Sequence, residues 1–124
     1  MVLLTNYFSS LQQARLNNFG IGKFFSYCYG EDLIKPAKEA FINACGKNNP
    51  SECVMIGDNI DIDIIGAKES GLKTIFVNSK GLNVNQNVGI TVNSVEEISL
   101  NLISKLENNS YGGMKIWENV LKEK

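Results

Sequence analysis

The sequence predicts a single α/β domain built on a doubly wound, mostly parallel sheet. Short apolar runs alternate with segments of helical spacing along most of the chain. The runs at 2–5 and 53–56 are apolar without alternating polar residues, which is typical of strands buried on both faces of a parallel sheet. The length of 124 residues, with 44% hydrophobic residues, fits one domain with a real core.

Each predicted strand is a short apolar run that ends at a polar residue or a glycine. The five expected strands are 2–5, 24–29, 53–56, 73–77 and 88–92. Because helical segments separate them, the strands should pair in parallel through right-handed crossovers. We therefore expect a Rossmann-like, three-layer α/β/α architecture, in which ligands bind beyond the carboxyl ends of the strands.

Four helices are expected between or after these strands, each marked by a terminus residue. A serine at 9 or 10 can cap the first helix, Pro36 suits the first turn of the second, and glycines follow the first three. The approximate spans are 9–20, 36–46, 64–71 and 95–106. These elements define a core domain over residues 1–107.

Residues 108–124 are set apart by a joint rich in asparagine and glycine. Beyond it, the apolar residues Ile116, Trp117, Val120 and Leu121 predict a short amphipathic tail helix. That helix either packs back on its own domain or docks on a partner chain.

Composition excludes several classes of protein. Twelve basic against thirteen acidic residues argue against nucleic-acid binding. The chain has no apolar run long enough for a bilayer, and its start lacks the features of a signal peptide, so we expect a cytoplasmic protein. The three cysteines form no CxxC pair and are expected to be small buried hydrophobes. The absence of histidine excludes any His-based triad or His metal ligand in this chain.

The residues after the third predicted strand are the first candidates for chemistry. Gly57 lets the backbone turn or approach a ligand, and Asp58 lies where a carboxylate could bind Mg²⁺. Asp61 and Asp63 follow near the start of the next helix. The alternative interpretation is structural, with Asp58 as a turn former and Asp61 or Asp63 as helix N-terminal acids.

Two further groups of polar residues lie at other strand or helix ends. Thr5 and Asn6 end the first strand, where a hydroxyl and backbone amides can cradle a phosphate, or simply form the entry turn of a helix. Lys35 precedes Pro36, and its ammonium either neutralises a phosphate and a carboxylate together or is an exposed charge beside a helix start.

In this order, the three groups resemble the haloacid dehalogenase (HAD) superfamily, whose members are mostly Mg²⁺-dependent phosphatases. The similarity covers roughly residues 2–107. The residues that carry it are Thr5 and Asn6 for the second family motif, Lys35 and Pro36 for the third, and Gly57, Asp58 and Asp63 for the acidic fourth.

The resemblance implies a role for each matching residue. Asp58 would ligate Mg²⁺, and Asp63 would hold Lys35 or a metal-bound water. Lys35 would stabilise the phosphoryl transition state, while Thr5 and the Asn6 amide would hold the phosphate oxygens. No role is implied for Asp61. The expected activity is that of a phosphatase acting on a small phosphorylated metabolite.

The chain departs from the family at the nucleophile. The family's first motif is a strand ending in Asp-x-Asp, and no such pattern precedes Thr5; the substrate-selecting cap is also missing. The chain therefore resembles the carboxyl-terminal half of such an enzyme and is expected to be inactive alone. The alternative is a degenerate, non-catalytic α/β module that binds a partner or an anion.

Without its central first strand, the sheet should either keep two open strand edges or pair its neighbouring strands directly. Open buried edges favour association. We therefore expect a rearranged sheet, a homodimer that fills the gap, or a complementing amino-terminal half supplied in trans.

Overall fold

The computed structural model describes residues 1–108, so the predicted tail helix lies outside the described residues. In this part of the chain the strands and α-helices are β1 (Val2–Leu4), α1 (Ser9–Asn18), β2 (Tyr27–Tyr29), α2 (Lys38–Cys45), β3 (Val54–Gly57), α3 (Ile65–Glu69), β4 (Lys73–Val77), β5 (Ile90–Val92) and α4 (Leu100–Asn108). Short 3₁₀ helices occur at Gly22–Phe24, Pro50–Glu52 and Val95–Glu97, and a π-helix, η3, spans Ile60–Ile64.

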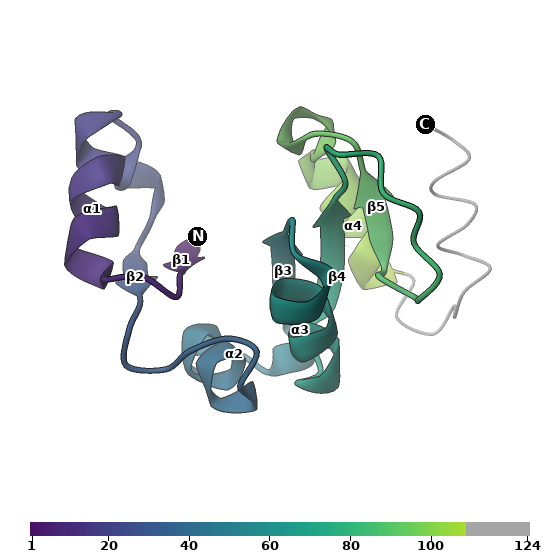
Figure 1. Ribbon diagram of the computed structural model, residues 1–124, viewed down its shortest axis with the longest axis horizontal. Coiled ribbons are helices and arrows are strands. Elements are labelled where there is room, and N and C mark those ends of the chain that lie inside the picture. Colours follow the sequence, from purple (N-terminus) through teal and green to yellow (C-terminus); the bar gives the residue numbers. More distant parts are fainter. Residues whose placement is uncertain (109–124) are drawn as a thin grey trace.

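All strand pairs within the described residues are parallel, as the sequence predicts, but they form two sheets (Figure 1). β1 pairs with β2, placing Leu3 opposite Cys28. The second sheet has the order β3-β4-β5. β1 and β3 are not paired with one another, so the expected open edges are present. The segment that carries α2 connects the two sheets and lies between them in Figure 1.

The element boundaries differ from the predicted ones in two instructive places. The predicted strand 24–29 is shorter, because Gly22–Phe24 forms a 3₁₀ turn and pairing begins only at Tyr27. The second helix begins at Lys38 and not at Pro36. Pro36 lies instead in a turn in which the Ala37 N–H donates to the Ile34 carbonyl. Two hydrogen bonds between the Asn6 side chain and the Lys35 backbone, one in each direction, fix this turn ahead of the helix.

The last two predicted helices also differ in detail. Helical structure begins at Ile60 instead of Ile64, because the Asn59 side chain accepts a hydrogen bond from the Ile62 N–H and caps η3. The predicted final helix is divided. Ser94 and Glu97 form a capping box over the 3₁₀ turn, and an extended Ile98 separates it from α4.

The three-stranded sheet has apolar packing on both faces. Alternate β4 residues point to opposite sides, so Ile75 and Val77 contact one cluster while Phe76 contacts the other. The first cluster packs against Leu102 and Leu106 of α4, and the second includes Ile64 of η3. Burial on both faces explains why the carboxyl-terminal part of β4, residues 75–77, is apolar without alternation, and the predicted span 73–77 is confirmed.

The amino-terminal unit, which we define as residues 1–30, is much less buried. Leu16 of α1 and Cys28 of β2 are its buried residues, whereas Phe8, Leu11 and Phe19 are each at least 60% exposed. Across residues 1–108, no helix is long and apolar enough to cross a bilayer.

Candidate active site

Hydrogen bonds link the predicted site residues Asn6, Lys35 and Asp63, and Thr5 directly precedes Asn6 in the chain. Thr5 and Asn6 directly follow β1, and Gly57 ends β3. Lys35 comes from the connection between β2 and α2, and Asp63 from η3. Hydrogen bonds join Asn6 to Lys35, and Lys35 to Asp63. The carboxyl ends of β1 and β3 therefore lie on the same side of the molecule, where parallel α/β sheets bind ligands.

The Lys35 ammonium forms an ion pair with the Asp63 carboxylate. The Nζ–Oδ1 distance is 2.6 Å, and the two side chains are only 11% and 9% exposed. Neither charge would be stable at such low exposure without its partner. Asp63 was expected to hold either Lys35 or a metal-bound water, and in this structure its carboxylate contacts Lys35. An ammonium carries three hydrogens, so this contact leaves others for a third group.

The Asn6 side chain fixes the backbone of Lys35. Its Oδ1 accepts from the Lys35 N–H at 2.8 Å, and its Nδ2 donates to the Lys35 carbonyl at 3.0 Å. This pair of bonds satisfies both backbone groups of one residue and sets the direction in which its side chain leaves the turn. The sequence-based prediction concerned only the Asn6 amide, so it missed this function of the side chain; the polar residue at a strand end was the available clue.

Gly57 allows Asp63 to approach the end of β3. A Cβ atom at position 57 would lie 2.6 Å from both Cβ and Oδ2 of Asp63, so no other residue fits without displacement. The Asn59 N–H donates to Asp63 Oδ2 at 3.3 Å, and the Asp63 N–H donates to the Asn59 carbonyl at 2.9 Å. The carboxylate is thus held by backbone and ammonium together.

Thr5 extends the β1–β2 ladder by donating its N–H to the Tyr29 carbonyl at 3.0 Å. Its Oγ1 accepts from the Tyr7 N–H at 3.1 Å, which forms a local turn after the strand. A hydroxyl that accepts in this way keeps its own proton for donation to an acceptor such as a phosphate oxygen.

The described residues do not by themselves form a magnesium site. Asp58 is exposed at the end of β3, whereas the Asp63 carboxylate is already engaged by Lys35. Residues 1–108 contain no group of three acidic, cysteine or histidine side chains placed to hold a metal ion. Mg²⁺ often uses only one or two protein carboxylates together with water and phosphate oxygens, so Asp58 alone would be a partial ligand set.

Comparisons with known proteins agree on the class. A family model described as HAD-hydrolase-like matches residues 33–87, which include Lys35, Asp58 and Asp63 but not Thr5 or Asn6. Pyrimidine 5'-nucleotidase YjjG of Escherichia coli is 32% identical over 83 residues, which are 62% of this chain and 37% of the relative. Human N-acylneuraminate-9-phosphatase is 32% identical over 88 residues, which are 66% of this chain and 36% of the relative.

Solved structures show the same similarity. The HAD-hydrolase YfnB from Bacillus subtilis, determined bound to magnesium, has a TM-score of 0.67 and 27% identity, covering 76% of this chain and 45% of that one. A dehalogenase has a TM-score of 0.70 and 25% identity, with 77% and 46% covered. The chain belongs to the haloacid dehalogenase superfamily of hydrolases. It spans little more than a third of the length of the curated relatives it matches.

Proposed function

We propose that this chain supplies the supporting half of a phosphoryl-transfer site in a HAD-type phosphatase. The observation that carries the proposal is the position of the Lys35 ammonium, held 2.6 Å from Asp63 and oriented by Asn6 at the carboxyl ends of β1 and β3. A fixed, poorly hydrated positive charge is the group that stabilises negative charge on a transferring phosphoryl group.

The other predicted site residues take complementary roles in this proposal. The Thr5 hydroxyl and the Asn6 backbone amide hold phosphate oxygens beside Lys35. Asp63 is a positioning residue for the lysine. Asp58 contributes one carboxylate to Mg²⁺, which supplies Lewis-acid stabilisation when bound. The two phosphatase relatives named above support a small phosphorylated metabolite as the substrate.

The nucleophile is proposed to come from elsewhere. Covalent phosphoryl transfer of this type needs a carboxylate at the reacting centre. Asp63 is neutralised by Lys35, and Asp61 is an exposed residue of η3. We therefore expect the chain alone to show no turnover, and we expect a complementing amino-terminal half, or a second copy, to complete the site.

A second candidate is a non-catalytic module that binds an anion or a partner. The observation that favours it is the lack of a metal-binding cluster among residues 1–108. Both candidates predict phosphate binding at Lys35, but only the first predicts turnover when the missing half is added.

The testing experiment measures hydrolysis of p-nitrophenyl phosphate with Mg²⁺, and phosphate binding by calorimetry. We expect no hydrolysis by the chain alone and weak phosphate binding that Lys35→Met abolishes. Lys38→Met is the matched control, because Lys38 is an exposed lysine at the start of α2. Equal phosphate binding by both variants would contradict the assigned role of Lys35.

Hydrolysis by the purified chain that Asp58→Ala abolishes would also overturn the assignment. In that case a residue of this chain must act as the nucleophile, and Asp61 and Asp63 are the first to replace. Hydrolysis that appears only after an amino-terminal half is added, and that Lys35→Met removes, would establish the proposed division of the site.

A further inference from the structure

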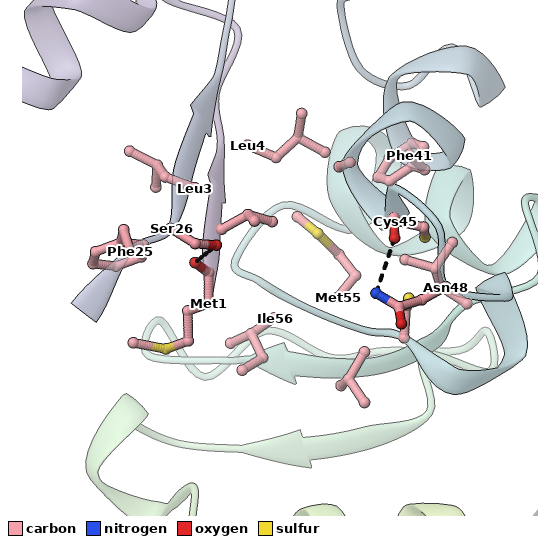
Figure 2. Close-up of a pocket in the computed structure, with 15 residues that line it drawn as sticks. Met1, Leu3, Leu4, Phe25, Ser26, Phe41, Cys45, Asn48, Met55 and Ile56 are labelled. Atoms are coloured by element: carbon pink, nitrogen blue, oxygen red, sulfur yellow. Dashed lines mark hydrogen bonds between the residues drawn. The ribbon is translucent and has the colours of Figure 1, made fainter. Parts of the chain in front are cut away.

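Two cysteines lie close together at the amino-terminal end of β3. Cys45 is the last residue of α2, and Cys53 directly precedes β3. Both line an apolar groove of about 580 Å³ between the two sheets (Figure 2), and both are free thiols. The polar site described above lies at the opposite, carboxyl-terminal end of β3. The two cysteines therefore form a separate feature of the molecule.

The turn after α2 brings these cysteines to adjacent anchoring points. Gly46, with a φ of +61°, ends the helix. The Cys45 carbonyl accepts hydrogen bonds from the N–H and from the side-chain Nδ2 of Asn48, each at 3.1 Å (the second is dashed in Figure 2). The Cys53 thiol donates to the carbonyl of the next residue, Asn49, at 3.5 Å. Neighbouring residues of one turn thus hold both cysteines.

Further hydrogen bonds hold the rest of this connection. The Asn49 side chain accepts from the Ser51 N–H at 3.4 Å and caps the 3₁₀ helix Pro50–Glu52. The Cys53 N–H donates to the Pro50 carbonyl at 3.0 Å, which closes that turn directly before β3. A hydrogen-bonded connection therefore sets the spacing of the two cysteines.

The two thiols have different surroundings. Cys45 is only 6% exposed, whereas Cys53 is half-buried. Burial, followed by a hydrogen bond with Cys53, raises the pKa of the Cys45 thiol to about 12. This interaction between the side chains agrees with the geometry of the turn. Because the thiolate is the reactive form, Cys45 is a poor first nucleophile, and the more accessible Cys53 is the thiol that reacts first.

We propose that Cys45 and Cys53 form a modification site that takes small disulfides, such as oxidised glutathione, and closes reversibly into an intramolecular disulfide. The bond ties the end of α2 to the start of β3 and closes a covalent ring over residues 45–53. This site does not depend on the proposed phosphoryl-transfer function, which resides at the other end of β3.

The reaction has two exchange steps. In the first, the Cys53 sulfur attacks one sulfur of oxidised glutathione, the S–S bond breaks, and the glutathione that leaves takes up the Cys53 proton. In the second, the Cys45 sulfur attacks the Cys53 sulfur of the mixed disulfide, and the second glutathione leaves with the Cys45 proton. Two protein thiols are oxidised by two electrons, and one glutathione disulfide is reduced to two thiols. The fixed position of Cys45 compensates for its small thiolate fraction.

Reaction of the complete chain with oxidised glutathione tests the site. Samples are quenched with N-ethylmaleimide at timed intervals, digested with trypsin and analysed by mass spectrometry. Cleavage after Lys47 separates the two cysteines, so their bond appears as two linked tryptic peptides, 39–47 and 48–68. Cys28 is the internal control, because it is buried on β2 and its thiol donates to the Ser9 carbonyl.

The bridged form should predominate over the mixed disulfide. With glutathione at about 0.1 mM, we expect at least about tenfold more bridge than mixed disulfide at Cys53, because a thiol held nearby has an effective concentration of about 1 mM or more. Cys28 should stay unmodified. Dithiothreitol should return the original thiols, since the bond forms by reversible exchange.

Single variants assign the two steps. Cys45→Ser should accumulate the mixed disulfide at Cys53, since no second thiol resolves it. Cys53→Ser should slow the reaction with glutathione at least about tenfold, because the remaining groove thiol is buried and protonated. Cys28→Ser is the matched control and should form the bridge at the original rate. Circular dichroism checks each fold, and Cys45→Ala replaces Cys45→Ser if the latter fails to fold.

The bridged form is also expected to be more stable than the dithiol. A bond that closes a short ring constrains the unfolded chain, so the melting temperature should rise by about 5–10 °C. Cys28→Ser treated in the same way should show the same rise, and Cys45→Ser should show none. A lower melting temperature after bridge formation would show that the bond distorts the native turn, which contradicts the proposal.

Three other results would overturn the proposal. The first is accumulation of the mixed disulfide at Cys53 in the original chain to the level seen in Cys45→Ser. The second is a bond from Cys28 to either groove cysteine that is as abundant as the Cys45–Cys53 bond, which would assign the exchange to the unfolded chain. The third is a predominance of disulfides between chains, with a share that increases with protein concentration.

Discussion

The amino-terminal unit and the three-stranded sheet both contain many apolar residues but bury them to very different degrees. Ile75, Phe76 and Ile90 of the sheet are fully buried. In the amino-terminal unit, Phe19 is 79% exposed and Phe8 is 61% exposed. The sheet has helices or loops on both faces, whereas in the amino-terminal unit β2 packs against α1 and β1 packs against α2.

The difference shows how many strands a stable layer needs. Two paired strands are at best marginally stable in water, and three with a covered face can be independently stable. β3-β4-β5 meets that requirement within the described residues, and β1-β2 does not. The amino-terminal unit therefore depends on contacts through Lys35 and α2, and on any strand that joins the two sheets.

The largest expected effect is in the core of the three-stranded sheet. Phe76→Ala should lower the free energy of unfolding by about 4 kcal/mol, since it removes a fully buried aromatic ring. Phe24→Ala in the amino-terminal unit should change it by less than about 0.5 kcal/mol, because that ring is 55% exposed. Urea denaturation monitored by circular dichroism measures both. Similar losses from the two variants would contradict the comparison.

The ion pair between Lys35 and Asp63 should have the next largest effect. Asp63→Ala leaves the ammonium of Lys35 buried and unpaired, which should cost about 3 kcal/mol. Lys35→Met should cost a similar amount, and the double variant should cost clearly less than the sum. A double-mutant cycle in urea measures this coupling. Additive losses would show that the pair does not link the two regions.

Asn6→Ala should have a smaller and more local effect. It removes two hydrogen bonds to the Lys35 backbone and should cost about 1–2 kcal/mol. Hydrogen exchange should accelerate at β1 and β2 while β4 keeps its protection. Asn17→Ala, in exposed α1, is the control and should leave both regions unchanged. Equal acceleration in β4 would mean that the two regions open as one unit.

The smallest expected effect is a dependence on pH at the start of α1. A hydrogen bond from the Ser9 N–H is the largest cause that lowers the pKa of the fully exposed Glu31 carboxyl. The stability that this hydrogen bond contributes to the folded state is complete above the ordinary glutamate pKa of about 4.3. It is lost as the pH falls through the lower pKa that Glu31 has in the folded state. Glu31→Gln should remove this pH dependence from the stability of α1 that hydrogen exchange measures. If the pH dependence of α1 hydrogen exchange were unchanged in this variant, another titrating group would be its cause.

Much of the three-stranded sheet could be predicted from the sequence, because both faces of its strands are buried. The run 73–77 ends in three consecutive apolar residues before a polar Asn78, a pattern typical of a parallel core strand. The aromatic residues of 24–29 misled the prediction, since Phe24 belongs to a 3₁₀ turn and is mostly exposed. Aromatic content indicates a strand only where a neighbouring layer buries the rings.

The candidate site was predictable as a set of residues but not as a set of contacts. Lys35 and Asp63 are 28 residues apart, and their pairing depends on a turn that spacing alone does not define. The Asn6 clamp crosses 29 residues and could not be identified from the residue types around it. The roles of Thr5 and Asp58 toward phosphate and metal stay predictions, as do the tail helix and the location in the cell.

The exposed apolar surface of the amino-terminal unit also has a consequence for synthesis. Residues 1–30 leave the ribosome before any strand of the three-stranded sheet exists, so the region less able to fold by itself is made before the more stable one. The roughly 80 residues that follow require about 4–16 s at ordinary elongation rates. During that interval Phe8, Phe19 and the free edge of β1 are accessible to chaperones and to neighbouring nascent chains. For this chain, the order of translation is opposite to the order in which stable layers can form.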